Sequence, residues 1–276
     1  MIELEKKSNP SISVLMPAYN SEKYISEAID SILNQTFRNF EFIILDDGSD
    51  DNTNNIIKEY SKKDQRIIVV ENKNNNGIPI SRNRLINIAR GKYVAWQDSD
   101  DISINNRLEK QLNFLEDNHK VGIIGGNVAS LYRKKNIGIR HYCANDKQIR
   151  RKIFIFSPLA QQVAMIRKEC FEKVGVYNEN YCLTEDLDML FRIGNFYQFA
   201  NIQKVVGKYR IHEKSATFTK IKKMELNAFK IKFKNLRNKN YSFSFFDIFF
   251  NLIYFTFTFI FSSKTKIYIY NKIRNK

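Results

Sequence analysis

Three carboxylates follow directly on a short apolar stretch in the middle of the chain. Tyr93 to Trp96 has the β-branched and aromatic pattern of a buried strand, and Asp98, Asp100 and Asp101 come right after it. Side chains two apart in an extended chain share a face, about 6 to 7 Å apart at the backbone. Asp98 and Asp100 could therefore hold one hard cation, which would offset their repulsion. The alternative is an acidic turn that caps a helix starting near Asn105.

Two further polar clusters also follow predicted strands. The turn Pro17-Ala18-Tyr19-Asn20 closes the apolar run Ile12 to Met16, and the acidic stretch beginning with Asp46 and Asp47 follows Glu41 to Leu45. Ligands of open α/β sheets bind beyond the carboxyl ends of the strands, so we expect these clusters to converge on one crevice. The sequence has neither the G-x-G-x-x-G nor the G-x-x-x-x-G-K-[ST] pattern, which argues against dinucleotide and P-loop phosphate sites.

The segments that would position these clusters alternate between strand and helix. The first helix is expected to be capped by Ser21 and to reach Leu33, and the second follows the acidic stretch and ends at about Tyr60. A strand is expected at 67–70, and a third helix begins near Pro79 and reaches Ala89. Four such alternations predict an α/β fold with a mainly parallel sheet flanked by helices.

The second half of the chain is predicted in less detail. We expect helices at 105–118 and 168–174, the second ended by Gly175, and a helix opened by Thr184, Glu185 and Asp186, with Thr184 as its cap. Strands are expected at 121–127, 161–167 and 205–211. Residues 131–153 are basic and irregular and receive no assignment, although this segment is where acceptor selection could reside.

Charge is distributed unevenly over the 276 residues. The net charge is +16, and residues 220–276 hold 13 Lys and Arg against only Glu225 and Asp247. We therefore predict a nearly balanced domain at 1–219 and a basic tail at 220–276. Three cysteines without C-x-x-C spacing indicate reduced thiols, and the charged start, Met1 to Pro10, is not a secretory signal. Both features favour a cytoplasmic protein.

The tail also contains a strongly aromatic segment. Ser242 to Phe261 has ten aromatic residues and one charge, and as a helix it aligns Ser244, Asp247, Asn251 and Thr258 in one polar stripe. With basic residues on both sides, this pattern predicts a segment that lies on an anionic membrane surface, at the inner face of the cell membrane. A helix packed against the domain or a partner subunit is the alternative, and the alternation at 256–259 also suits a strand.

Six short motifs resemble, in order and spacing, the family two glycosyltransferases, which have the GT-A fold. They cover about residues 10 to 219 and are Pro17-Ala18-Tyr19-Asn20, Asp46-Asp47-Gly48-Ser49, Ser81-Arg82-Asn83, Asp98-Ser99-Asp100-Asp101, Glu185-Asp186 and Tyr209-Arg210-Ile211-His212. The resemblance implies an inverting transfer of one hexosyl or N-acetylhexosaminyl group from a nucleotide sugar, most often a UDP-sugar. The implied acceptor is a glycan or lipid-linked hydroxyl in the synthesis of cell-surface polysaccharide or lipooligosaccharide.

The same resemblance implies a role for each motif. Asp186, or alternatively Glu185, would be the general base, and Asp98 and Asp100 would hold a Mn²⁺ or Mg²⁺ ion on the diphosphate, with His212 as a further candidate ligand. Arg82 is expected to face the nucleotide or its diphosphate. Contacts to the nucleotide sugar are expected from Pro17, Tyr19, Asn20, Glu22, Asp46, Asp47, Arg82, Asp98 and Ser99.

Two other functions use some of the same features. A sugar nucleotidyltransferase also needs an acidic pair at a strand end, but the turn at 17–20 is not a Gly-rich phosphate loop. A nucleic-acid-binding protein is suggested by charge alone, and here the basic groups flank an apolar segment, so we expect no nucleic acid partner. The Gln-x-x-Arg-Trp motif of processive relatives is absent, which favours single additions.

Overall fold

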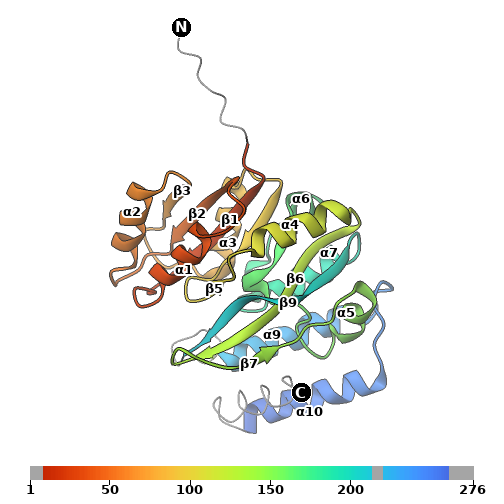
Figure 1. The fold of residues 1–276 in the computed structure, drawn as a ribbon. Coiled ribbons are helices and arrows are strands. Elements are labelled where there is room, and N and C mark those ends of the chain that lie inside the picture. The colour runs from red at the N-terminus through yellow and green to blue at the C-terminus, as the bar shows by residue number, and fades with distance from the viewer. Residues whose placement is uncertain (1–8, 213–219, 261–276) are drawn as a thin grey trace.

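The computed structural model describes residues 9–212 and 220–260 of the chain. A nine-stranded sheet runs through the molecule, with helices on both of its faces (Figure 1). The strands are β1 (Ile12–Ala18), β2 (Phe40–Asp46), β3 (Ile67–Glu71), β4 (Tyr93–Trp96), β5 (Ile102–Ser103), β6 (Val121–Tyr132), β7 (Lys135–Arg140), β8 (Met165–Arg167) and β9 (Gln198–Ile211).

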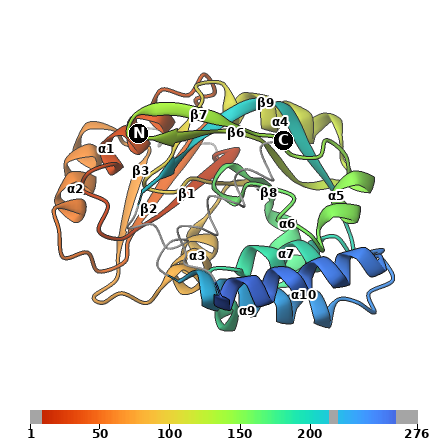
Figure 2. The same cartoon turned by 90° about the horizontal axis from the view of Figure 1, so that it is seen from below.

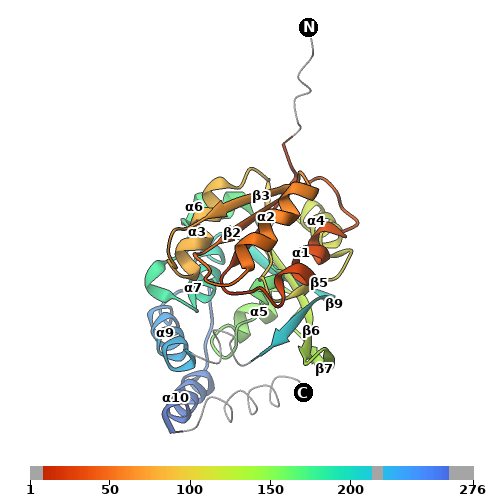
Figure 3. The same cartoon turned by 90° about the vertical axis from the view of Figure 1, so that its left-hand side faces the viewer.

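The α-helices connect these strands or follow them. They are α1 (Ile25–Leu33), α2 (Thr53–Lys63), α3 (Ile78–Ile88), α4 (Arg107–Asp117), α5 (Asp146–Lys152), α6 (Lys168–Val174), α7 (Glu185–Ile193), α9 (Ile221–Lys234) and α10 (Phe245–Ile260). In the view of Figure 3, α1 and α2 lie to one side of β2 and α3 lies to the other. The predicted α/β class is confirmed.

The sheet has the order β3-β2-β1-β4-β8-β6-β9-β5, with β7 paired to β6. The first four strands in sequence pair in parallel, in the order β3-β2-β1-β4, and β6 and β9 pair in parallel too. The short strands β5, β7 and β8 are antiparallel to their neighbours. This parallel half places the carboxyl ends of β1, β2 and β4 at one edge, as the alternation of strands and helices predicted.

Alternate residues of the parallel strands enter two separate hydrophobic cores. In β1, Leu15 packs on the side of α3, whereas Val14 and Met16 pack on the side of α1. Such strands are apolar on both faces because helices cover both, which explains the continuous apolar runs in the sequence.

Several predicted boundaries differ from the structure. Residues 161–167 do not form one strand, because Gln161–Val163 is a 3₁₀ turn in which Ala164 N–H donates to Gln161 O, and only Met165–Arg167 pairs with β4. An apolar run of this length does not distinguish a turn from a strand. Strand β9 is longer than predicted because its whole length pairs with β6. The unassigned basic segment contains β7 and α5, and Asn145 caps α5 by accepting from Gln148 N–H.

Of the two predicted caps, Ser21 is wrong and Thr184 is correct in position only. The hydroxyl of Ser21 donates to the Tyr19 carbonyl and lies 2.7 Å from the Ser99 hydroxyl, so it caps no helix. Thr184 does stand at the N-cap position of α7, but its hydroxyl donates to the carbonyl of Tyr181, at 3.1 Å, and makes no side-chain cap. In both cases the hydroxyl donates to a carbonyl of the turn before the helix, so it does not bind the free N–H groups of the first helical turn. Gly175 does end α6, with a φ of 79°.

The basic tail packs against the domain in two layers. Figure 3 shows α9 below α7, with α10 below α9. Ile231 of α9 is fully buried, and the Tyr241 hydroxyl donates to the carbonyls of Leu190 and Phe191 in α7. The aromatic segment is helical, as predicted, and its Phe261 end lies outside the described residues. Within the described ranges no helix has both the length and the apolar composition to cross a bilayer. The division into 1–219 and 220–276 stays a prediction.

Candidate active site

The three carboxylates after β4 form a compact acidic group at the edge of the sheet. One carboxylate oxygen from each of Asp98, Asp100 and Asp101 lies within 4.8 Å of the others. Oδ1 of Asp101 accepts from Arg210 N–H, while its buried Oδ2 has no hydrogen-bond partner among the described residues. Clustered carboxylate oxygens with an unsatisfied acceptor suit a divalent hard cation such as Mg²⁺ or Mn²⁺. The predicted pairing of Asp98 and Asp100 at this edge therefore fits the geometry.

The end of β9 supports this acidic group. His212 Nε2 lies 2.8 Å from Asp100 Oδ2, and its ring packs on Tyr24 with the ring centroids 5.0 Å apart. The buried Arg210 guanidinium donates to the Asp100 carbonyl at 2.8 Å and to Glu27 at 2.6 Å. Arg210 thus binds the backbone of the acidic loop at Asp100, and His212, just after the strand, contacts the Asp100 carboxylate.

Arg82 lies inside the site and bridges two of its acidic segments. Its guanidinium is 5.2 Å from the Trp96 ring and 5.8 Å from the Tyr177 ring. Nη1 lies 2.8 Å from Glu185 Oε1, and Nη2 lies 3.5 Å from Asp98 Oδ1. Burial works to lower the pKa of Arg82, but the carboxylates of Glu185 and Asp98 outweigh it, so that this pKa is raised. Arg82 forms ion pairs with Asp98 and Glu185 within the protein, and its contact with the nucleotide or its diphosphate stays a prediction.

Glu185 and Asp186 begin α7 but have different surroundings. Glu185 is 2% exposed, and burial raises its pKa to about 7 although Arg82 acts to lower it. Asp186 is half-buried, and its Oδ1 accepts from Leu187 N–H at 2.8 Å. Burial also raises the pKa of Asp186, with Arg82 opposing. Because Glu185 is engaged by Arg82, the arrangement favours Asp186 of the two for proton transfer with a bound ligand.

Two carboxylates of the acidic group after β4, those of Asp98 and Asp101, have raised pKa values. Burial raises the pKa of Asp98 to about 6, with the nearby Asp100 adding to the increase and Arg82 opposing it. Burial raises the pKa of Asp101 well above its usual range as well. A dense group of carboxylates with one bridging arginine has a net negative charge, which favours a cation over a second anion.

The clusters after β1 and β2 lie against each other at the same edge. Asn20, with a φ of 48°, accepts from Asp50 N–H, and its own N–H donates to Ser49. Tyr19 is 43% exposed and free to stack on a ligand. Asp46 is 2% exposed, and its carboxylate accepts from the backbone and hydroxyl of Ser49.

Four other residues that were predicted to contact the nucleotide sugar have partners within the protein at this edge. Asp47 is buried and accepts from Asn72, Asn76 N–H and Gly77 N–H, so it fixes the loop before α3. The exposed Glu22 accepts from Asn52 N–H at 3.2 Å, and Ser99 pairs with Ser21. Pro17 is half-buried beside Leu45. These side chains shape the edge, and their contact with a nucleotide sugar stays a prediction.

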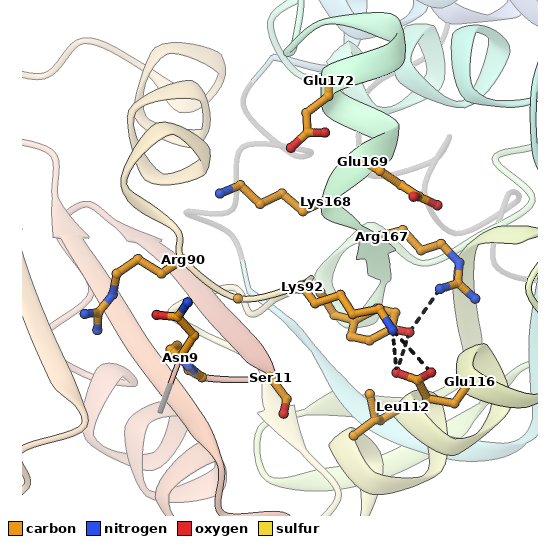
Figure 4. A pocket seen from close by; sticks show the side chains of 13 residues that line it. Asn9, Ser11, Arg90, Lys92, Leu112, Glu116, Arg167, Lys168, Glu169 and Glu172 are labelled. Atoms are coloured by element: carbon orange, nitrogen blue, oxygen red, sulfur yellow. Dashed lines mark hydrogen bonds and ion pairs between the residues drawn. The ribbon is translucent and has the colours of Figure 1, made fainter. Parts of the chain in front are cut away.

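A pocket lies at the opposite, amino-terminal end of β1 and β4 (Figure 4). Several of its charged groups already have partners within the protein. Lys92 and the Tyr93 hydroxyl both contact Glu116, at 3.0 and 2.8 Å, and Lys168 Nζ donates to the Ala89 carbonyl. The guanidinium of Arg167 donates to Val121 O. These contacts connect neighbouring elements of the fold, so we interpret the pocket as a structural feature and not as the active site.

Some residues of the site had no separate signal in the sequence. Tyr177, which stacks beside Arg82, belongs to a loop without a motif, and Glu27 is an ordinary exposed glutamate of α1. Arg210 was visible as part of the motif at 209–212, but its contacts with Asp100, Asp101 and Glu27 depend on tertiary structure.

Comparison with known proteins agrees with this geometry. Residues 13–175, more than half of the chain, match the family described as glycosyl transferase family 2. An uncharacterized glycosyltransferase of Methanocaldococcus jannaschii is 35% identical over 87% of this chain and 86% of its own length. An uncharacterized glycosyltransferase of Haemophilus influenzae is 31% identical over 82% of this chain and 73% of its own length.

Solved structures share the fold at low sequence identity. S. aureus TarS 1-349 in complex with UDP-GlcNAc is 21% identical, with a TM-score of 0.67 over 83% of this chain and 67% of that one. The mannosyltransferase PcManGT from Pyrobaculum calidifontis, in complex with GDP-Man and Mn²⁺, is 17% identical, with a TM-score of 0.66 over 85% and 66% of the two chains. The predicted GT-A fold is confirmed, and the sugar nucleotidyltransferase alternative is set aside. By sequence and by fold, the chain belongs to glycosyl transferase family 2.

Proposed function

We propose that this glycosyltransferase moves one sugar from a UDP-sugar to a hydroxyl group of a glycan or lipid-linked acceptor, with inversion at the anomeric carbon. The observation that carries the proposal is the convergence of Asp98 and Asp100 with the half-buried Asp186, through Arg82, at one edge of the sheet. Structures of the same fold in complex with UDP-GlcNAc and with GDP-Man and Mn²⁺ support a nucleotide-sugar donor and a divalent ion.

Asp98 and Asp100 are the residues that would hold the ion, with His212 beside Asp100. When bound, a divalent ion offsets the charge that grows on the nucleoside diphosphate as the bond to the sugar breaks. The protein contributes the position of these carboxylates. Arg210 fixes the backbone of the acidic loop, and Arg82 keeps Asp98 next to the start of α7.

Asp186 would take the proton of the acceptor hydroxyl as that oxygen attacks the anomeric carbon. Burial raises the pKa of Asp186, which makes it a stronger base than a solvent-exposed aspartate. Attack from the face opposite the leaving diphosphate, in a single displacement, inverts the anomeric configuration. We expect the exposed Tyr19 to stack on the nucleotide base and the buried Asp46 to accept a hydrogen bond from that base.

The acceptor and its location are part of the same proposal. The exposed apolar residues of α10 and the basic tail favour a lipid-linked acceptor in the synthesis of cell-surface polysaccharide, with the enzyme at the inner face of the membrane. No nucleic acid partner is expected.

The test is a metal-dependent screen of nucleotide sugars, read out by thermal shift and by donor hydrolysis. We expect stabilisation by a UDP-sugar only when Mn²⁺ or Mg²⁺ is present. Asp186→Asn should lower transfer at least about a thousandfold while donor binding persists, and Asp100→Ala should weaken the metal-dependent binding. Asp117→Asn, on the exposed end of α4, is the matched control. Transfer by Asp186→Asn at the normal rate would exclude this residue as the base.

A further inference from the structure

Helix α10 exposes an unusually apolar face. Its residues Phe245, Phe246 and Phe249 are 93%, 65% and 61% exposed. Leu252, Ile253 and Ile260 continue the same face at helical spacing and are also exposed. We call these six residues the apolar face of α10. Contiguous apolar surface of this kind is rare on soluble monomers and marks an interaction site.

Two residues of the predicted polar stripe, Asp247 and Asn251, are turned toward the domain. Asn251 Nδ2 donates to the Phe154 carbonyl at 2.7 Å, and Asn251 Oδ1 accepts from Lys232 of α9 at 2.9 Å. Asp247 is 7% exposed, and its carboxylate accepts from Ser244 N–H at the start of the helix. A polar stripe on a surface helix ordinarily faces water. Here it anchors the helix to the protein, so the apolar side points away.

Aromatic contacts fix the helix in this orientation. The Phe250 ring packs against Phe156, with 5.7 Å between the ring centroids, and Phe255 packs against Phe229 of α9 at 5.0 Å. Figure 2 shows α9 and α10 running alongside each other beneath α7. The helix is therefore held on two sides by rings and on its inner side by hydrogen bonds. The packing of the helix therefore determines that its apolar face points away from the domain.

The surrounding charge indicates which partner this face would take. Within 220–260 there are eight Lys and Arg against Glu225 and Asp247, and the exposed ones include Lys230, Lys234 and Arg237. A second copy docking on the same face would bring two such basic surfaces together, which is unfavourable. An anionic lipid surface attracts the same groups, each by about 1 kcal/mol close to the surface. The charge therefore favours lipid over self-association.

We propose that α10 lies in the plane of an anionic bilayer, with its apolar face inserted at the boundary between headgroups and acyl chains. This deepens the proposed function, because it names the surface on which a lipid-linked acceptor is met. In Figure 1, α10 lies on the side of the molecule toward which the carboxyl end of β1 points. Because contacts to Phe154, Phe156 and α9 hold α10 against the domain, insertion of the helix would fix the orientation of the domain on the lipid surface.

The test measures the binding of the full-length protein to vesicles of phosphatidylcholine mixed with phosphatidylglycerol, by flotation at low salt. We expect binding to these vesicles and much weaker binding to phosphatidylcholine alone. Phe246→Ser combined with Phe249→Ser should weaken the partitioning about tenfold or more. Phe196→Ser is the matched control, because Phe196 is 58% exposed in the turn between α7 and β9, and its ring contacts Lys173. This control should bind as the wild type does.

A second measurement reports insertion directly. Phe246→Trp places an indole on the apolar face, whereas the native Trp96 is fully buried in the core. We expect vesicles with brominated acyl chains to quench the new indole. Absence of wild-type binding, equal binding by the double variant, or an unquenched indole would each overturn the proposal. So would a stable dimer in sedimentation that the double substitution dissociates, because a second copy would then cover the face.

Failure here is distinguishable from failure of the proposed function. Vesicle binding requires neither donor nor acceptor, so Asp186→Asn should bind vesicles as the wild type does. The double variant in α10 should retain metal-dependent donor hydrolysis in solution, because neither phenylalanine contacts the acidic residues of the site. A protein that hydrolyses a UDP-sugar but ignores anionic vesicles would keep the proposed function and lose the membrane inference.

Discussion

At the residue scale, the centre of the site is an arginine shared by two acidic segments. Arg82 and Glu185 are both nearly fully buried, and their ion pair is 2.8 Å long. Removing one partner of such a pair leaves an uncompensated buried charge, which costs about 3 to 5 kcal/mol. The second contact of Arg82, with Asp98 at 3.5 Å, links this pair to the acidic loop after β4.

We therefore expect Arg82→Met to lower the free energy of unfolding by about 3 kcal/mol at pH 8. The loss should be smaller at pH 6, because Glu185 is then largely protonated. Its pKa of about 7 lies above the ordinary 4.5, so folding favours the protonated form, and the contribution of Glu185 to stability falls as the pH rises through this range. Urea unfolding of the wild type and of Arg82→Met at the two pH values measures both effects.

The matched control for this prediction is the double variant Arg82→Met with Glu185→Gln. Replacing the carboxylate by a neutral amide removes the unpaired charge, so the double variant should regain part of the lost free energy of unfolding. The difference in stability loss between pH 6 and pH 8 should also disappear. If Arg82→Met lost the same free energy with and without Glu185→Gln, the ion pair would not be the source of the effect.

At the element scale, the end of β9 acts as a support for the acidic loop. Arg210 donates from its backbone to Asp101 and from its side chain to the Asp100 carbonyl and Glu27. Its contact with Glu27 reaches an exposed carboxylate and should contribute little. The contact with the Asp100 backbone sets where the carboxylates lie, and this is the more consequential one.

Arg210→Met should weaken Mn²⁺ affinity, measured by titration calorimetry with UDP present, about tenfold. Arg210→Lys should recover little, because an ammonium group cannot reproduce the planar guanidinium contact over Tyr24. Lys208→Met, on the same strand but paired with Ile102, is the control and should leave the affinity unchanged. Equal metal affinity in Arg210→Met and the wild type would reduce Arg210 to a stabilising residue without a positioning role.

The elements differ in how far the sequence alone defines them. Apolar runs that end in acidic residues or proline were sufficient to locate β1, β2 and β4. Because the carboxyl ends of parallel strands lie at the same edge of the sheet, these runs also located the edge with Asp46, Asp98 and Asp100. The pairing of Arg210 with Glu27 spans 183 residues, and no local pattern encodes it. The polar stripe of α10 was visible as well, but its inward direction depends on Phe154 and Lys232, which only the tertiary structure brings beside it.

At the scale of the whole molecule, the tail and the domain share one core. Ile231 of α9 and Tyr241 belong to the same buried cluster as Phe191 and Ile193 of α7. Gly194, at the end of α7, lies against the Tyr241 hydroxyl so closely that any side chain there would collide with it. The tail therefore completes the packing of the domain as well as carrying the apolar face of α10.

Deleting residues 220–276 should accordingly destabilise the domain, with a fall in the melting temperature of roughly 5 °C or more. Metal-dependent donor hydrolysis in solution, where no membrane is needed, should decline with it. The double substitution in α10 should leave both quantities near the wild-type values. A truncated protein with an unchanged melting temperature would show that the tail is dispensable for folding.

Helix α7 has a further consequence for how this enzyme is studied. Its first turn carries Asp186, and the carbonyls of Leu190 and Phe191 near its far end accept hydrogen bonds from the Tyr241 hydroxyl. Removing the tail to obtain a more soluble sample would thus leave Asp186, the proposed proton acceptor, on a helix with one end unsupported. Kinetic constants from such a sample would describe an enzyme with a less rigid active site. Kinetic work should therefore use the intact chain, in detergent or in lipid nanodiscs.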